Sequence, residues 1–167
     1  MVFDCIRKAW PGLLVAVVTV ISGCAATGNG SGLEKLLPPS HLAYSPKQAE
    51  VLAREGKQAY EQGDVEGAIQ SWQSAVSLNP ADAVTVNNLA LVLKDENRFA
   101  EAAKLLEKGV DASPETAELH YNLAVISELY LLQLEKALIH YKRYQQLANA
   151  EDAAVDGWLV DLERRLQ

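Results

Sequence analysis

The sequence predicts an all-α fold built from stacked pairs of helices. Two observations carry this prediction. Residues 56–80 contain two short helical patterns separated by the turn signal Gly63-Asp64, and the same pattern returns 34 residues later. Pro80 ends the second helical pattern, because the residue before a proline is disfavoured in the α conformation. With 167 residues, 49% hydrophobic and 22% charged, the chain has the composition of one globular domain.

The repeat is defined by residue size at fixed offsets. From Gly56, small residues follow at 12 and 19 positions, a large apolar residue at 16 and a proline at 24. These are Ala68, Ala75, Trp72 and Pro80. From Ala90 the same offsets reach Ala102, Gly109, Leu106 and Pro114. Small residues at these positions indicate that one helix approaches another closely and leaves room for the large residue.

This pattern resembles the tetratricopeptide repeat, a helix-turn-helix unit of 34 residues. The resemblance covers roughly residues 49–149. It implies a right-handed superhelical stack in a domain of residues 46–150, with repeats at about 49–82, 83–116 and 117–150, followed by a capping helix at 151–167. The third repeat departs from the pattern: Ala137 and Tyr141 come one residue late, Tyr144 replaces a small residue and Asn149 replaces proline.

Seven helices are expected, at about 46–61, 64–78, 82–95, 98–112, 114–130, 134–148 and 151–166. Ser45-Pro46-Lys47-Gln48 predicts a capping box with proline in the first helical position, and Ser113-Pro114-Glu115 predicts a similar start. The last helix is amphipathic, and we expect Trp158 to be its main buried contact with the final repeat.

Residues 1–23 have the features of a signal peptide: basic Arg7 and Lys8, then an apolar run at 13–21 that is too short to span a bilayer. The ending Ile21-Ser22-Gly23-Cys24 resembles the bacterial lipobox, which implies that Cys24 is acylated, for example with palmitate, and becomes the first mature residue. An ordinary signal peptide with a stray cysteine, or an uncleaved anchor, are the alternatives. Residues 24–45 are then the lipidated cysteine and a flexible linker. By the same resemblance, Ala25 in place of Asp favours the outer membrane, facing the periplasm.

The charge balance excludes one class of partner. Removal of residues 1–23 leaves 13 basic and 21 acidic residues, a net side-chain charge of −8. Nucleic acid would be repelled rather than attracted.

Signals of catalysis are missing from the sequence. It contains no Gly-x-Ser-x-Gly motif and no glycine-rich phosphate loop between a strand and a helix. His41, His120 and His140 look isolated, with the last two on helix surfaces, and no metal-ligand spacing accompanies them. We therefore expect no enzyme activity, no cofactor and no metal.

In the resembling family, the first helices of successive repeats line a concave groove that binds a peptide or a partner helix. The residues expected there are Lys57, Tyr60, Asn87, Asn88, Leu91, Lys94, Tyr121, Asn122 and Val125. Asn88 and Asn122 stand one period apart, either as an amide ladder for a ligand or simply as common family residues. The few basic residues are interleaved with acids, so a dedicated carboxylate clamp is not expected.

A second candidate surface is the third turn, where Tyr130, Leu131 and Leu132, flanked by Leu129 and Leu134, replace polar residues. Exposed together they would form a patch that indicates a partner. The interpretation favoured by the shifted spacing is that these residues pack under the C-terminal cap.

These features together predict a lipid-anchored adaptor or assembly factor. It would bind a protein or peptide partner in an envelope machine of the pilus, secretion or envelope transport type. The alternative is a regulator or scaffold that recruits cell-wall hydrolases or proteases.

Overall fold

The structure is a computed structural model that describes residues 44–148 and 153–167. The predicted signal peptide, Cys24 and nearly all of the linker lie outside the described residues. The described part contains seven helices and no strand, as the sequence predicts. None of these helices combines the length and the apolar character that a membrane crossing requires. The helices are α1 (Pro46–Glu61), α2 (Val65–Leu78), α3 (Ala83–Asp95), α4 (Phe99–Ala112), α5 (Ala117–Leu129), α6 (Leu134–Ala148) and α7 (Ala153–Arg165).

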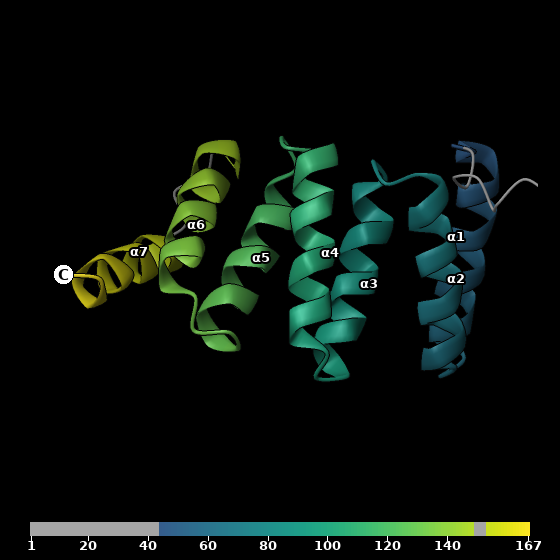
Figure 1. Ribbon diagram of the computed structural model, residues 1–167, viewed down its shortest axis with the longest axis horizontal. Coiled ribbons are helices and arrows are strands. Elements are labelled where there is room, and N and C mark those ends of the chain that lie inside the picture. The colour runs from purple at the N-terminus through teal and green to yellow at the C-terminus, as the bar shows by residue number, and fades with distance from the viewer. Residues whose placement is uncertain (1–43, 149–152) are drawn as a thin grey trace, which may run out of the picture. The chain divides into compact units, whose positions relative to one another are not determined.

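The helices form three antiparallel hairpins that pack in chain order. α1 packs on α2, α3 on α4 and α5 on α6, and each hairpin contacts the next through α2–α3 and α4–α5. α7 packs on α6 at the end of the series (Figure 1). Because each hairpin contacts only its neighbours, an apolar face left open at the last hairpin needs a covering element, and α7 supplies it.

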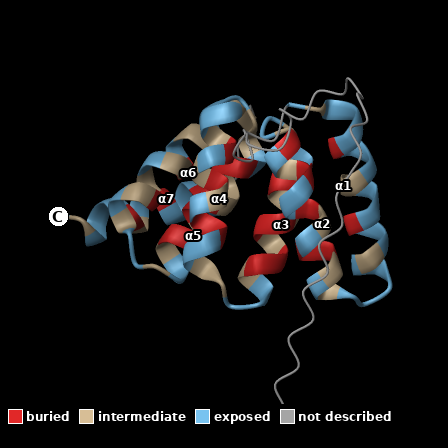
Figure 2. Ribbon diagram, turned by 45° about the vertical axis from the view of Figure 1, so that its right-hand side comes forward, coloured by how far each residue is buried: buried red, intermediate tan, exposed pale blue. Residues whose placement is uncertain are grey.

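Buried residues recur along all the helices, although α7 is mostly exposed (Figure 2), and the buried side chains form two core clusters. The larger extends from Ala68 in α2 to Ile126 in α5 and includes Trp72. The smaller joins the last hairpin to the cap, with Tyr141 as its largest member; it comprises Ala124, Ala137, Tyr141, Val155, Leu159 and Leu162. The outer faces of the helices carry the exposed residues (Figure 2).

Small residues lie where the sequence pattern predicts close helix approach. A Cβ atom on Gly56 would be 2.6 Å from Cδ1 of Trp72, so α1 and α2 can be this close only with glycine there. The Trp72 indole N–H donates to the carbonyl oxygen of Ala53 at 3.1 Å. Gly109 is equally crowded, with Cγ1 of Val86 2.6 Å from its would-be Cβ.

The three turns inside the hairpins share one backbone feature. Gly63, Asn97 and Leu132 adopt the left-handed conformation, with φ of 82°, 61° and 54°. Glycine and asparagine tolerate this conformation, whereas leucine is strained there. In the second turn Arg98 N–H donates to the carbonyl five residues earlier, but in the third turn Gln133 N–H donates six residues back. The one-residue shift of the third repeat is therefore an insertion in its turn.

Two predicted helix starts are wrong in detail. Ser45 precedes α1 and proline occupies its first turn, but the serine side chain makes no capping bond; its backbone N–H instead donates to Leu78 O at 3.0 Å. Ser113 ends α4 rather than starting α5, and its hydroxyl donates to Ala81 O of the preceding repeat at 3.0 Å. The Ser45 bond thus lies within the first hairpin and the Ser113 bond reaches the preceding repeat, and α5 begins only at Ala117.

Trp158 is not the main buried contact of the cap, in contrast to the prediction. Trp158 remains 39% exposed, whereas Val155, Leu159 and Leu162 are buried. The rotation of α7 about its axis points these three residues at α6, because they share one helix face. Trp158 lies at the flank of this contact, with its ring 5.7 Å from that of Tyr141.

Replacing Gly56 with alanine should destabilise the protein. Alanine improves helix propensity by about 0.5–1 kcal/mol, but forcing a methyl group against the buried Trp72 ring costs about 1–3 kcal/mol. We therefore expect a lower free energy of unfolding, measured by denaturant titration with circular dichroism.

Gly157→Ala is the matched control. Gly157 is also helical, but no atom lies within 4 Å of its would-be Cβ. This change should raise the free energy of unfolding by about 0.5–1 kcal/mol. Equal stabilisation by both changes would contradict a close contact between α1 and α2.

Candidate functional site

A pocket of about 470 Å³ lies between α1 and α3. Trp72 reaches it from α2 through the space beside Gly56, and its ring is 5.8 Å from that of Tyr60. Leu91 and Val92 add apolar surface from α3. The complete lining is Lys57, Tyr60, Glu61, Trp72, Asn88, Leu91, Val92, Lys94 and Asp95. A mainly apolar pocket with a few polar groups is the usual form of a binding site.

A second pocket, of about 250 Å³, lies between α3 and α5. It is lined by Ala83, Val84, Asn87, Asn88, Thr116 and Glu118. Asn88 lines both pockets, so they are neighbours on the same side of α3. We call the two pockets together the groove.

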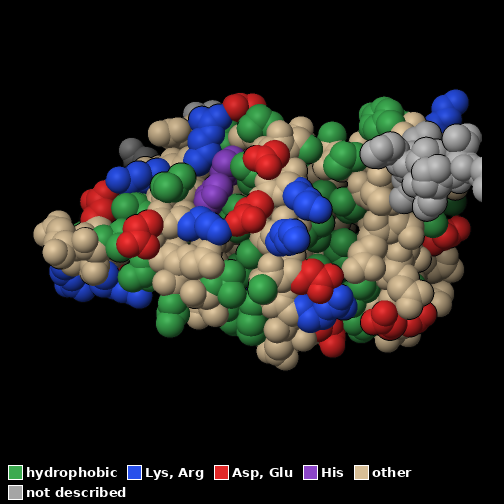
Figure 3. Space-filling view, viewed as in Figure 1, with side chains coloured by type: hydrophobic (Ala, Val, Ile, Leu, Met, Phe, Trp, Pro, Cys, Tyr) green, Lys and Arg blue, Asp and Glu red, His purple; other side chains and the backbone are tan. Residues whose placement is uncertain are grey.

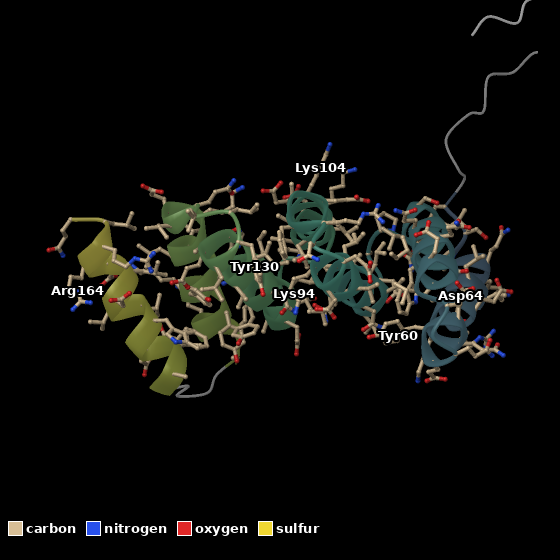
Figure 4. All side chains as sticks on the ribbon, turned by 90° about the horizontal axis from the view of Figure 1, so that it is seen from below. Tyr60, Asp64, Lys94, Lys104, Tyr130 and Arg164 are labelled. Carbon is tan, nitrogen blue, oxygen red and sulfur yellow. The ribbon has the colours of Figure 1, made fainter. Side chains whose placement is uncertain are left out.

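The groove lysines are both paired with carboxylates. Lys57 Nζ lies 3.7 Å from Glu61 Oε1 on α1, and Lys94 Nζ lies 3.1 Å from Asp95 Oδ1 on α3. Figure 4 shows Tyr60 and Lys94 on neighbouring hairpins, while Lys104 projects from the opposite side of the helices. The first pocket therefore carries no excess positive charge.

Asn88 and Asn122, expected one period apart on the groove, have different surroundings in the structure. The Asn122 amide N–H donates to Asn87 Oδ1 at 2.6 Å and links α5 to α3. Consecutive residues on a helix point about 100° apart. Asn87 bonds to Asn122 at the second pocket, while Asn88 lines both pockets. Within the described part of the chain, the Asn88 side chain has no hydrogen-bond partner and is available to a ligand.

Two of the predicted groove residues contact the C-terminal helices. The Tyr121 ring lies 5.1 Å from that of Tyr144 and 6.3 Å from that of Trp158. Val125 packs against the smaller core cluster, which joins the last hairpin to the cap. The pockets of the groove thus lie along α1, α3 and the start of α5, and a role of Tyr121 and Val125 in binding stays a prediction.

The residues of the third turn divide into packed and exposed ones. Leu131 packs against the larger core cluster and Leu134 against the smaller one. Leu129 and Leu132 are 61% and 74% exposed. Packing of the whole turn under the cap, the favoured interpretation, is therefore wrong.

Tyr130 points toward the preceding repeat. It is 44% exposed, and its ring stacks on that of Phe99 at 4.2 Å. Phe99 opens α4, next to the second turn, so the extra residue of the third turn places an aromatic ring between neighbouring turns. The cap lies beyond α6 and does not cover this ring contact.

The sequence did not reveal that His120 and His140 form a pair. Their Nδ1 atoms are 2.9 Å apart, and His120 is buried rather than on the surface. Figure 3 shows the histidines among basic and acidic side chains. The sequence does hold one signal of this pairing, since each histidine is ten residues from Tyr130 at the turn. In an antiparallel hairpin, residues equidistant from the turn face each other.

The hydrogen bonds of the pair define its protonation. His120 Nε2 donates to the Pro114 carbonyl at 3.0 Å, since that oxygen can only accept. In the neutral ring His120 Nδ1 then accepts, and His140 Nδ1–H donates to it. Burial, His120 and Lys136 lower the pKa of His140 to about 4, against the opposing effect of Glu107.

A charged network fastens the cap to the last hairpin. The Tyr141 hydroxyl donates to Glu128 Oε2 at 3.2 Å, and Arg165 Nη1 lies 3.0 Å from Glu128 Oε1. Burial and the Glu128 carboxylate raise the pKa of the Tyr141 phenol far above its ordinary range. These three residues do not line the groove. No cluster of three or more metal-ligating side chains occurs in the described residues.

Comparison with known proteins agrees with this architecture. A family model described as TPR repeat matches residues 56–96. The first TPR domain of Spaghetti (RPAP3), bound to the HSP90 peptide SRMEEVD, superposes with a TM-score of 0.64 at 20% identity, over 76% of this chain and 98% of that one. The described helices form a tetratricopeptide repeat stack. The MamA protein has a similar fold, with a TM-score of 0.63 at 19% identity over 73% of this chain and 66% of that one.

Two curated relatives share parts of the sequence. Stress-induced-phosphoprotein 1 of Caenorhabditis elegans is 38% identical over 61 residues, 36% of this chain and 19% of the relative. Photosystem I assembly protein Ycf3 of Prochlorococcus marinus (strain MIT 9211) is 28% identical over 107 residues, 62% of this chain and 60% of the relative. The chain spans less than two thirds of either relative.

The histidine pair should make stability of the tetratricopeptide stack pH-dependent. The pKa of His140 is about 4 in the folded chain, against an ordinary value of 6.5. The folded state then binds fewer protons than the unfolded state between these values, so the free energy of unfolding falls as the pH drops from 6.5 toward 4. Denaturant unfolding at a series of pH values measures this fall.

His140→Asn tests the source of the fall. The asparagine amide can donate to His120 Nδ1 but does not titrate. We expect a smaller loss of stability with falling pH than in the parent protein. Parallel curves for the two proteins would show that another group is responsible.

Proposed function

We propose that this tetratricopeptide protein is a lipid-anchored adaptor or assembly factor of the bacterial cell envelope. It binds an extended segment of a protein partner in the groove, as part of a pilus, secretion or envelope transport machine. It works without catalysis, by holding its partner at the membrane. Acylation of Cys24 and outer-membrane attachment facing the periplasm belong to this proposal.

The groove is the observation that carries the binding part of the proposal. It combines apolar surface from Tyr60, Trp72 and Leu91 with the amide of Asn88, which has no hydrogen-bond partner among the described residues. An extended peptide offers both apolar side chains and unpaired backbone groups, and an amide can donate to and accept from such a backbone. The arrangement thus suits a peptide better than a compact polar metabolite.

The similar proteins support the same class of function. The RPAP3 domain is bound to a peptide, and Ycf3 is named an assembly protein. Their likeness to this chain supports a role in protein association. The envelope setting rests on the N-terminal sequence alone.

A carboxylate placed in the groove should abolish partner capture. Leu91 is half-buried in the pocket lining, so Leu91→Asp would place a charge against the apolar part of a bound segment. We expect capture of partners by the full-length acylated protein to fall by at least about ten-fold. Cross-linked partners recovered from membranes measure the effect.

Ile139→Asp is the control for this change. Ile139 is 63% exposed on α6, outside the groove, and the substitution introduces the same charge. Capture should be unchanged. If both variants retain their partners while remaining folded, the groove is not the binding surface, and the Tyr130–Leu132 turn is the next candidate.

The lipid anchor has its own test. Cys24→Ser should prevent labelling with palmitate and release the protein from membranes, because several acyl chains are needed for a stable anchor. Cys5→Ser, which changes the other cysteine of the chain, should retain both properties. A Cys24→Ser protein that is still labelled, or still bound to membranes, would refute acylation at this position.

A further inference from the structure

We propose that the groove selects an extended segment with a bulky apolar side chain and, beside it, a basic side chain. The apolar side chain enters the pocket between α1 and α3, and the basic one enters the pocket between α3 and α5. This inference rests on the proposed function, and it names the chemistry of the partner at the same site.

The first pocket determines the apolar part. Tyr60 supplies a half-exposed aromatic ring, the buried Trp72 ring lies 5.8 Å from it, and Leu91 and Val92 complete the apolar lining. The Trp72 indole N–H is already engaged by the Ala53 carbonyl, so the ring offers the ligand mainly apolar contact. A volume of about 470 Å³ accommodates a side chain as large as phenylalanine or tryptophan.

The pairing of the lysines argues against an acidic partner. An anionic side chain that approached Lys57 would meet Glu61, and one that approached Lys94 would meet Asp95. Exchanging one of these pairs for a pair with a bound anion gains little binding free energy, because an exposed ion pair contributes at most about 1 kcal/mol. The groove therefore lacks the free cations that binding of an acidic peptide requires.

The second pocket determines the basic part. Glu118 lies in its lining, is exposed and has no ion-pair partner among the described residues. Among the residues that the structure describes, no lysine or arginine lines this pocket. Val84, 70% exposed at the same place, can cover the methylene groups of a lysine or arginine whose charge meets Glu118.

Asn88 connects the two pockets. Its side chain lines both, and it has no hydrogen-bond partner in the described chain. A backbone amide of the bound segment that passes between the pockets meets this side chain. The bond between Asn87 and Asn122 ties α3 to α5 and keeps the two walls of the second pocket together.

The inferred chemistry differs from that of the peptide on the RPAP3 domain. That peptide, SRMEEVD, carries three acidic side chains next to its carboxyl end. The charges of the present groove disfavour such a sequence. SRMEEVD is therefore an informative negative probe, because a similar fold binds it.

Fluorescence polarisation with the full-length acylated protein in detergent tests the inference. The probes are labelled peptides of one length that carry Phe or Ser at one position and Lys, Ser or Glu nearby, in both orders, together with SRMEEVD. The Phe–Lys peptides should bind best. Replacing Phe with Ser should weaken binding roughly ten-fold, and replacing Lys with Glu should weaken it roughly two- to five-fold.

Two variants separate a local charge contact from a general field effect. Glu118→Lys should reverse the preference between the Lys and Glu peptides. Glu135→Lys is the matched control, because Glu135 is likewise an exposed acid in the first turn of its helix, α6, and does not line the groove. The Glu135→Lys protein should keep the preference of the parent protein for the Lys peptides over the Glu peptides. Asn88→Ala should lower the affinity for all of the binding peptides by a similar factor.

Tighter binding of SRMEEVD or of the Glu peptides, equal effects of the two glutamate variants, or no binding of any peptide would overturn the inference. Such failures are distinct from failure of the proposed function. If Leu91→Asp still loses its partner while the peptides prefer acids, the groove binds a partner of other chemistry. If the Leu91→Asp protein keeps its partner, the proposal that the groove is the binding surface is wrong.

Discussion

Helix α1 lies against α2 because position 56 has no Cβ, and the space this leaves is filled by the Trp72 ring. The same contact has two consequences. It closes the first hairpin, on which the second hairpin packs, and it brings the indole ring to the surface of the pocket between α1 and α3. The packing of the first hairpin and the shape of this pocket thus depend on one contact between a small and a large residue, since a side chain at position 56 would displace the ring that lines the pocket.

The two junctions of the stack differ in one contact between side chains. At the junction of α3 with α5, the Asn87–Asn122 bond holds the helices together. At the junction of α1 with α3, the residue one period before Asn87 is Ala53, which has no amide to pair with Asn88. The larger pocket of the groove lies there, with Asn88 in its lining. Repeats of the same fold therefore offer different surfaces because single side chains at equivalent positions differ.

Toward the C-terminus the stack changes from regular packing to polar networks. The third hairpin carries the extra turn residue, the strained Leu132 and the histidine pair, and Glu128 joins it to α7. A buried polar group with a hydrogen-bond partner avoids much of the cost of leaving water. Here the Pro114 carbonyl and the two imidazoles satisfy one another, so a hairpin that departs from the repeat pattern can still pack.

The sequence by itself determined the helices, their turns and the repeat, because these depend on residues close together in the chain. Gly63-Asp64, the 34-residue period and the late Ala137 were sufficient for that. Which residues meet across helices depends on the rotation of each helix about its axis, and sequence spacing does not specify that rotation. Only the tertiary structure therefore decided that Asn122 bonds to Asn87, that His120 meets His140 and that Trp158 stays partly exposed.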